Sequence, residues 1–499
     1  MKIDLHVHSK HSKRPSIWLM QKIGCPESFT EPADVYEIAR RRGMTHVAIT
    51  DHNVIDGALE IADRPGVVIG EELTTYFVED RCKVHVLVWA IDEVLHRELQ
   101  EVRENLFDLV PYLQERGIHH AVAHPLSAVN DRLTAEHFEQ LLLLFKVFEL
   151  NADQDHLGNR TLRRVLDSLT PAEIERLADK HGIVPAFDEP WKKGHLSGSD
   201  DHSSLNIGTS YTEVAGAETL DDFFAEVVAD RAYTSVRPAN PQTVGRNVYS
   251  IAYQFFKDKF ALDRYTGSDL LLRYLDRSLL NEGCRDYGLL ERITFAWNSR
   301  RSRLYASRVD ASVANLLRQE ACKLIYEDPR LMAIVQDDEA ARENGERTWF
   351  AFVNQISSKA LSHFFTNIFD RVGNAQLFDI FHSIGSAGAL YALLAPYFVA
   401  FSMFSAERKL ARQIGQAFLD RNSAAGGHED TTRVAHFTDT FADVNGVART
   451  MQQNLDAAAR TGRDLTVVTC SDRPTGRADV RNFLPVGQYA LEEYPEQKL

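Results

Sequence analysis

The chain begins with the stretch Lys2-Ile3-Asp4-Leu5-His6-Val7-His8-Ser9, an apolar run that ends in two histidines one residue apart. The apolar residues predict a strand, and residues i and i+2 of a strand point to the same side. We therefore expect His6 and His8 to present both imidazoles on one side of the strand end. Two imidazoles on one side of a strand end could bind the same transition-metal ion.

The histidines are unevenly distributed along the chain. Of the 19 histidines, 15 lie within the first 202 residues. Neutral imidazole offers a lone pair near pH 7, so this bias indicates that the N-terminal part binds metal.

Short apolar runs alternate with helical spacing from residue 2 to about residue 234. The predicted strands are 3–7, 47–50, 67–69, 84–89, 121–123 and 147–150, and the predicted helices are 33–42, 93–116 and 135–144. This alternation predicts an α/β fold built on a parallel sheet or barrel. In parallel barrels the reactive groups lie at the C-terminal ends of the strands.

Histidine and carboxylate residues follow the predicted strands. They are His6, His8, Asp51, His52, Glu71, Glu72, His124, Glu149, Asp200 and His202, while His85 lies early in its strand. Buried charges without partners are costly, so this repeated placement favours a shared metal site over separately buried side chains.

These residues resemble the PHP family, the polymerase and histidinol phosphatase domain. The family blocks occur in order over about the first 240 residues. They read Asp4-Leu5-His6-Val7-His8-Ser9, Thr50-Asp51-His52, Gly70-Glu71-Glu72, the strand residue His85, Ala123-His124-Pro125, Glu149 and Gly198-Ser199-Asp200-Asp201-His202. The resemblance implies a distorted (β/α)7 barrel over residues 1–240, two or three divalent ions and phosphoesterase activity.

The resemblance also implies a ligand set. The implied metal ligands are His6, His8, His52, Glu72, His85, His124, Asp200 and His202. Of these, His6, His8, Glu72 and Asp200 would hold one ion, Glu72 would bridge to a second ion at His85 and His124, and His52 and His202 would face a third. Where relatives place an Asp or His after the first motif, this chain has Ser12-Lys13-Arg14-Pro15, which leaves the third site open. Zinc, manganese and iron all suit such mixed ligands.

Two neighbouring ions activate a bridging water and bind phosphate oxygens, so no side-chain nucleophile is needed. We expect Glu72, Asp200 and His202 to be catalytic, and Arg14 and Arg160 to bind the substrate phosphate. The predicted activity is hydrolysis of a small phosphorylated metabolite, or of a sugar or lipid phosphate.

The composition limits the alternatives. The chain has 499 residues, of which 44% are hydrophobic and 25% charged, as expected for a globular protein of several domains. Its net charge of −15, with no basic run, argues against nucleic acid as a partner. Five cysteines without a CxxC pair, and no signal peptide at the N-terminus, favour a cytoplasmic location.

The middle of the chain changes character after the prolines at 238 and 241, and helical spacing predicts an all-α domain over residues 245–422. The stretch 384–404 carries no formal charge. By length it qualifies as a membrane span. We favour a buried or interfacial helix, which would give peripheral membrane contact.

A small, polar linker precedes a third part, residues 433–499, with a predicted strand at 434–439, a helix at 448–459 and a strand at 465–469. This part resembles the beginning of group 1 retaining glycosyltransferases, cut short within the first Rossmann-like domain. One alternative is therefore a glycosyltransferase component with a regulatory barrel and a partner chain that supplies the missing half. Another is a metal-stabilised scaffold without catalysis.

Overall fold

The computed structural model describes residues 1–15, 21–22, 24–127, 129–280, 313–336, 345–373, 377–419, 433–472, 475–483, 490–491 and 494–498. The chain forms two compact units. The first, here called the barrel unit, comprises Met1–Val309, Ala321–Phe352 and Leu394–Asn422. The second, here called the C-terminal unit, comprises Asp310–Glu320, Val353–Leu393 and Ser423–Leu499.

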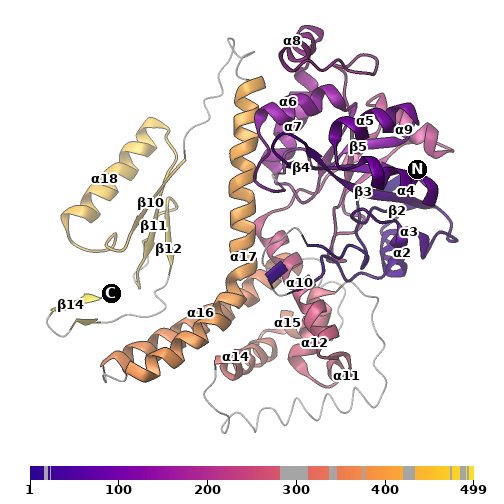
Figure 1. The fold of residues 1–499 in the computed structure, drawn as a ribbon. Coiled ribbons are helices and arrows are strands. Elements are labelled where there is room, and N and C mark those ends of the chain that lie inside the picture. The colour runs from indigo at the N-terminus through magenta and orange to yellow at the C-terminus, as the bar shows by residue number, and fades with distance from the viewer. Residues whose placement is uncertain are drawn as a thin grey trace. The chain divides into compact units, whose positions relative to one another are not determined.

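The barrel unit is built on a nine-stranded sheet with the order β7-β6-β5-β4-β3-β2-β1-β8-β9 (Figure 1). The strands are β1 (Lys2–Asp4), β2 (His46–Ile49), β3 (Val67–Phe77), β4 (Cys82–Trp89), β5 (His119–Val122), β6 (Val147–Asn151), β7 (Gly194–Gly198), β8 (Tyr211–Glu213) and β9 (Tyr233–Ser235). Strands β1 to β3 and β5 to β7 run parallel within each group. The sheet is mixed, because β4 runs antiparallel to both of its neighbours and β8 antiparallel to β1 and β9.

The two ends of the sheet approach each other, so that the sheet is nearly a closed barrel. Beyond β7, the amide of Asp200 donates to the carbonyl oxygen of His6 over 2.7 Å. The backbone of Ser197 also hydrogen-bonds the Thr212 hydroxyl on β8. Gly198 permits this approach, since a Cβ atom at that position would lie 2.4 Å from Cβ of His6.

The sheet departs at β3 and β4 from the parallel order that the sequence predicts. Strand β3 does not end near Gly70 but continues to Phe77 and turns back into β4, with pairing along its whole length. Glu72 therefore lies in the middle of a strand. Successive side chains of a strand point to opposite faces, so Glu71 and Glu72 lie on different faces of β3. Each of the two carboxylates has hydrogen-bonding partners on its own face.

Eight helices of the described chain accompany the barrel strands. They are α2 (Pro32–Arg41), α3 (Asp56–Leu59), α4 (Glu93–Val102), α5 (Leu106–Glu115), α6 (Ala135–Leu144), α7 (His156–Ser168), α8 (Pro171–His181) and α9 (Leu220–Val228). The helix predicted at 93–116 is two helices, because the Asn105 side chain accepts the amide of Phe107 and caps α5.

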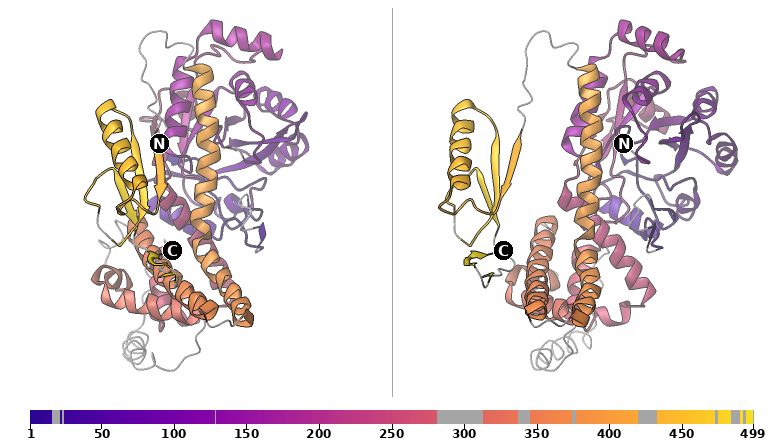
Figure 2. Two further views of the ribbon diagram at one scale, coloured as in Figure 1. Left: turned by 90° about the vertical axis from the view of Figure 1, so that its left-hand side faces the viewer. Right: turned by 60° about the vertical axis from the view of Figure 1, so that its left-hand side comes forward.

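Further helices follow the barrel strands. They are α10 (Pro241–Lys259), α11 (Asp263–Thr266), α12 (Leu270–Leu279), α14 (Val313–Glu327), α15 (Pro329–Val335), α16 (Gly345–Gly373) and α17 (Leu377–Phe418). The half of α17 that belongs to the barrel unit runs along the barrel helices (Figure 2). Leu410 and Ile414 share an apolar core with Phe138 of α6. Arg408 pairs with Asp155, the residue that caps α7. This half of α17 is thus fixed to the barrel.

The C-terminal unit contains a parallel sheet of β10 (Val434–Thr438), β11 (Leu465–Cys470) and β12 (Val480–Phe483), with α18 (Gly446–Thr461) between the first two strands. The hairpin strands are β13 (Ala490–Leu491) and β14 (Tyr494–Lys498). The predicted strand–helix–strand order is observed, and Asn445 caps α18. Phe437 and Phe483 are 73% and 62% exposed, so the sheet leaves apolar side chains uncovered.

Within the described chain, no helix is long and apolar enough to cross a membrane. The stretch 384–404 lies inside α17, and its side chains before Leu393 are outside the described residues.

Candidate metal centre

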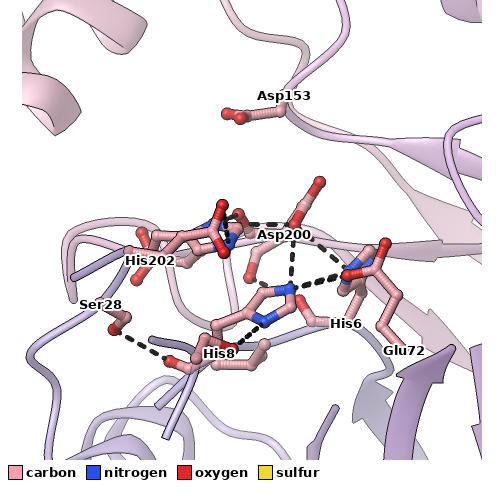
Figure 3. A network of polar contacts seen from close by, with 12 residues as sticks. His6, His8, Ser28, Glu72, Asp153, Asp200 and His202 are labelled. Atoms are coloured by element: carbon pink, nitrogen blue, oxygen red, sulfur yellow. Dashed lines mark hydrogen bonds and ion pairs between the residues drawn. The ribbon is translucent and has the colours of Figure 1, made fainter. Parts of the chain in front are cut away.

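The structure brings together all eight residues that the resemblance implies as metal ligands. Figure 3 labels five of them, namely His6, His8, Glu72, Asp200 and His202. The eight residues come from the ends of β1, β2, β5 and β7 and from the interiors of β3 and β4. Three groups of these side chains have ligand atoms close enough to hold an ion. The groups are His6, His8, Glu72 and Asp200; His52, Glu72 and His85; and His8, His52 and His202.

The ligand atoms of the first group lie close to one another. Nε2 of His6 lies 3.1 Å from Nε2 of His8, 3.1 Å from Oε2 of Glu72 and 3.2 Å from Oδ1 of Asp200. Nε2 of His8 lies 3.2 and 3.3 Å from the same two oxygens. A tetrahedral zinc site with bonds of about 2.0–2.1 Å has edges of about 3.3 Å. The five distances between ligand atoms are close to such an edge length, as expected of side chains that can hold a transition-metal ion.

Glu72 divides its two oxygens between different histidines. Oε2 lies 3.1 Å from His6 and 3.2 Å from His8, and it also lies 3.1 Å from Nδ1 of His52. Oε1 lies 2.6 Å from Nδ1 of His85 and 2.9 Å from Nε2 of His124. A carboxylate in this position is suited to join two neighbouring ions.

A carboxylate that the sequence did not reveal lies beside the third group. Oε2 of Glu27 lies 3.2 Å from Nε2 of His52, and Oε1 lies 3.8 Å from Nε2 of His202. Glu27 is buried and belongs to the loop before α2. It lies 19 positions after His8, in a segment without regular spacing, so no sequence signal distinguished it from an exposed glutamate.

Hydrogen bonds behind the cluster fix the orientation of the imidazoles. Nδ1 of His6 is bonded to Glu149, and Nδ1 of His8 to the Ser12 hydroxyl, which in turn donates to Asp51. Nδ1 of His202 is bonded to the carbonyl oxygen of Asp200. We assign the Nδ1 proton from these contacts, which leaves Nε2 of each ring for an ion.

Burial and charge oppose each other at these groups. Burial raises the pKa of the Glu72 carboxyl, but the surrounding imidazoles, His52 foremost, hold that pKa well below its usual range. Burial lowers the pKa of His8, but hydrogen bonds to Asp200 and Glu72 raise it to about 10. Burial dominates at His85 and lowers its pKa to about 4. The cluster thus combines ionised carboxylates with imidazoles.

Glu71 points away from the cluster. Its carboxylate accepts from Gln100 and contacts Nδ1 of His96, both on α4, at 3.0 Å. The alternation along β3 therefore directs Glu72, and not its neighbour, to the candidate centre.

A cavity of about 350 Å³ lies beside the cluster. Helices α10 and α17 provide an apolar part of its wall, with Val244, Val248, Ile251, Val399 and Met403. Asp153, Gln154 and Glu407 provide a polar part, and Figure 3 shows Asp153 set apart from the labelled residues of the cluster. Burial raises the pKa of Glu407 to about 7.

Neither arginine expected to bind the substrate phosphate belongs to this cavity. Arg14 is exposed in a loop, and Arg160 lies on the exposed face of α7. Among the described residues that line the cavity there is no lysine or arginine. Binding of an anion in this cavity would therefore depend on metal ions bound at the cluster.

The comparisons with known proteins are limited. No protein-family model matches the chain. The uncharacterized protein MJ1587 of Methanocaldococcus jannaschii is 40% identical over 80 residues, which are 15% of this chain and 45% of that protein. The chain thus spans less than half the length of the curated relative that it matches.

Two solved structures were also found, each 16% identical with a TM-score of 0.27. One is described as a "putative metal-dependent phosphoesterase" from Bifidobacterium adolescentis; the match covers 48% of this chain and 96% of that one. The other is an amidohydrolase from Chromobacterium violaceum, with 46% and 97% covered. At such scores these similarities carry no argument about activity.

Proposed function

We propose that the protein is a metal-dependent phosphoesterase of the PHP type, with hydrolysis carried out by residues 1–240. The observation that carries this proposal is the division of the two Glu72 oxygens between separate sets of histidines. A single structural ion would need one set of ligands. Two sets joined by a carboxylate are what a hydrolytic centre with neighbouring ions requires.

When bound, divalent ions would supply an activated water and a clamp for the phosphate oxygens. The chain's own residues prepare this site. His6, His8 and Asp200 converge on one position, and Glu149 orients His6. His52 and His202, with Glu27 between them, form a further position where a third ion would bind.

The cavity supports a small substrate. Its volume of about 350 Å³ is at the lower end of the range for ligand pockets. The apolar wall from α10 and α17 fits an apolar part of a leaving group, while the phosphate would lie at the cluster. We propose a small phosphorylated metabolite, or a sugar or lipid phosphate, as the substrate class.

The experiment is a test of reconstituted protein. The purified chain is loaded with zinc, manganese or iron, analysed for bound metal and assayed with a panel of phosphomonoesters and phosphodiesters. We expect at least two ions per chain and metal-dependent hydrolysis of a subset of the panel. The double variant His6→Ala/His8→Ala should lose at least one ion and the activity. Full activity of metal-free protein would refute the proposal.

A further inference from the structure

A second cavity in the barrel unit has the opposite charge character. It has a volume of about 280 Å³ and lies where α10 and α12, the start of α16, the loop at 205–206 and the end of α2 meet. Five arginines line it, here called the arginine pocket: Arg42, Arg237, Arg246, Arg277 and Arg347. Only one described lining residue, Glu346, is acidic. In a chain with a net charge of −15, this concentration of guanidinium groups is unusual.

Two of these arginines are anchored by neutral groups. Arg246 donates from Nε and Nη2 to the carbonyl oxygen of Ser278, at 3.1 and 2.6 Å. Arg42 donates to the carbonyl oxygens of Leu205 and Ile207. Backbone carbonyls position a guanidinium but do not neutralise its charge. Burial lowers the pKa of Arg246 to about 10, which shows how strongly that cation is desolvated.

The acidic residue is already engaged. Oε1 of Glu346 accepts from Arg237 at 3.0 Å, and Oε2 accepts from the Thr243 hydroxyl at 3.2 Å. Among the described lining residues, the five arginines therefore outnumber the one carboxylate, and positive charge is in excess.

A buried donor also lines the pocket. Among the residues that the structure describes, none accepts a hydrogen bond from the indole Nε1 of Trp349, although Trp349 is only 3% exposed. Buried N–H groups are rarely left unpaired, and those that are call for a ligand or a water. An anion in the cavity would provide both an acceptor for the indole and a counter-charge for the guanidinium groups.

We propose that the arginine pocket binds a small phosphate-bearing metabolite at a site separate from the metal cluster. Guanidinium groups pair with phosphate oxygens in fixed, often bidentate geometry, and several of them favour a ligand with more than one anionic group. The cavity is too small for a large ligand but accommodates a compact phosphorylated compound.

A short segment joins this pocket to the candidate metal centre. Asp200 and His202 belong to the cluster, while Leu205 and Asn206 line the arginine pocket. Asn206 and Ser203 both donate to Oδ1 of Asn247, at 3.0 and 3.2 Å, and Asn247 lines the cavity beside the cluster. A ligand in the arginine pocket would therefore lie next to the segment that carries two candidate ligands of the metal.

The test is calorimetric titration of the metal-loaded full chain with inorganic phosphate and with sugar phosphates that its hydrolase activity does not consume. We expect saturable binding that weakens at least about tenfold in Arg246→Gln and in Arg347→Ala. Arg330→Ala, which removes an exposed arginine of α15 outside the pocket, should bind as the wild type does. Binding that depends on the arginine pocket should persist in Glu72→Gln, which separates it from any phosphate bound at the cluster.

Arg347 is exposed, so its variant keeps the test valid if Arg246→Gln does not fold, as judged by circular dichroism. The proposal is overturned if wild-type chain binds no soluble phosphate compound, or if Arg347→Ala and every folded Arg246 variant bind as the wild type does. It is also overturned if binding is found only with vesicles that contain phosphatidylglycerol, since the ligand would then be a lipid surface.

Discussion

Nδ1 of His6 lies 2.8 Å from Oε1 of Glu149, and both side chains are fully buried. The second oxygen of Glu149 accepts the backbone amide of His124 and the side chain of Asn151. One carboxylate therefore fixes the ring orientation of one candidate ligand and the backbone position of another. Contacts of this kind behind metal ligands commonly control the affinity of the metal.

The first prediction concerns this contact. In Glu149→Gln, the NH2 group would face a donor in either orientation, either Nδ1 of His6 or the donors of His124 and Asn151, so the three hydrogen bonds could not all be kept with the proton on Nδ1 of His6. We expect the metal affinity to fall by about 10- to 100-fold, measured by competition with a chelator. Glu139→Gln is the matched control, because Glu139 is also buried but pairs with Lys180 and His181. Equal metal affinity in both variants would show that Glu149 does not control the binding of metal.

The second prediction compares two neighbours on β3. Glu72→Gln should reduce hydrolytic turnover by orders of magnitude. The amide offers a single oxygen, whereas each of the two sets of histidines lies against its own oxygen of the Glu72 carboxylate. Glu71→Gln should cost little, since the carboxylate of Glu71 is bonded to His96 and Gln100 of α4 and not to the cluster in the described chain. Both residues are fully buried, which makes the pair well matched. The reverse ranking of the measured turnover numbers would place the bridging role on Glu71.

The third prediction concerns protons. Burial lowers the pKa values of His8 and His124, but their carboxylate partners raise them to about 10 and about 9. Both rings are therefore protonated on both nitrogens, and positively charged, at pH 7.5 in metal-free protein. A metal needs the neutral imidazole. Metal binding should therefore release protons, and the affinity should rise with pH up to these values.

Calorimetric titrations with metal in two buffers of different ionisation enthalpy measure this release. We expect at least one proton released per chain at pH 7.5, and fewer in His8→Gln. An apparent enthalpy that is the same in both buffers would show that no proton leaves.

The sequence predicts the candidate centre better than it predicts the sheet that carries it. His6 and His8, Asp200 and His202 are paired by the two-residue period of a strand end, which is local information. The antiparallel course of β3 and β4 depends on long-range pairing, and the short motif around Gly70 does not reveal that the strand continues to Phe77. Arg160 does not line the cavity beside the cluster, and a charged residue on a helix gives no indication in the sequence of which cavity it faces.

The fourth prediction concerns Glu27, which no local pattern revealed. Glu27→Gln should weaken the position formed by His52 and His202, because it replaces the only carboxylate of the described chain paired with both rings. Elemental analysis after dialysis should find up to one ion fewer per chain, with the other ions retained. Glu31→Gln is the control, since Glu31 pairs with Lys10 and is largely exposed. A wild-type metal content in Glu27→Gln would exclude Glu27 as a ligand.

The fifth prediction concerns the C-terminal strands. Every described residue that forms the cluster or lines its cavity belongs to the barrel unit, so deletion of Arg433–Leu499 should leave hydrolytic turnover within a few fold. The deleted part holds three parallel strands and one helix between them, and its exposed Phe437 and Phe483 leave the sheet without a complete cover. An exposed apolar patch on a sheet commonly marks an interaction surface. We therefore expect no glycosyl transfer by the full chain with any nucleotide sugar, measured by release of the nucleotide. Transfer that disappears with the deletion would instead favour a glycosyltransferase component in which the barrel regulates.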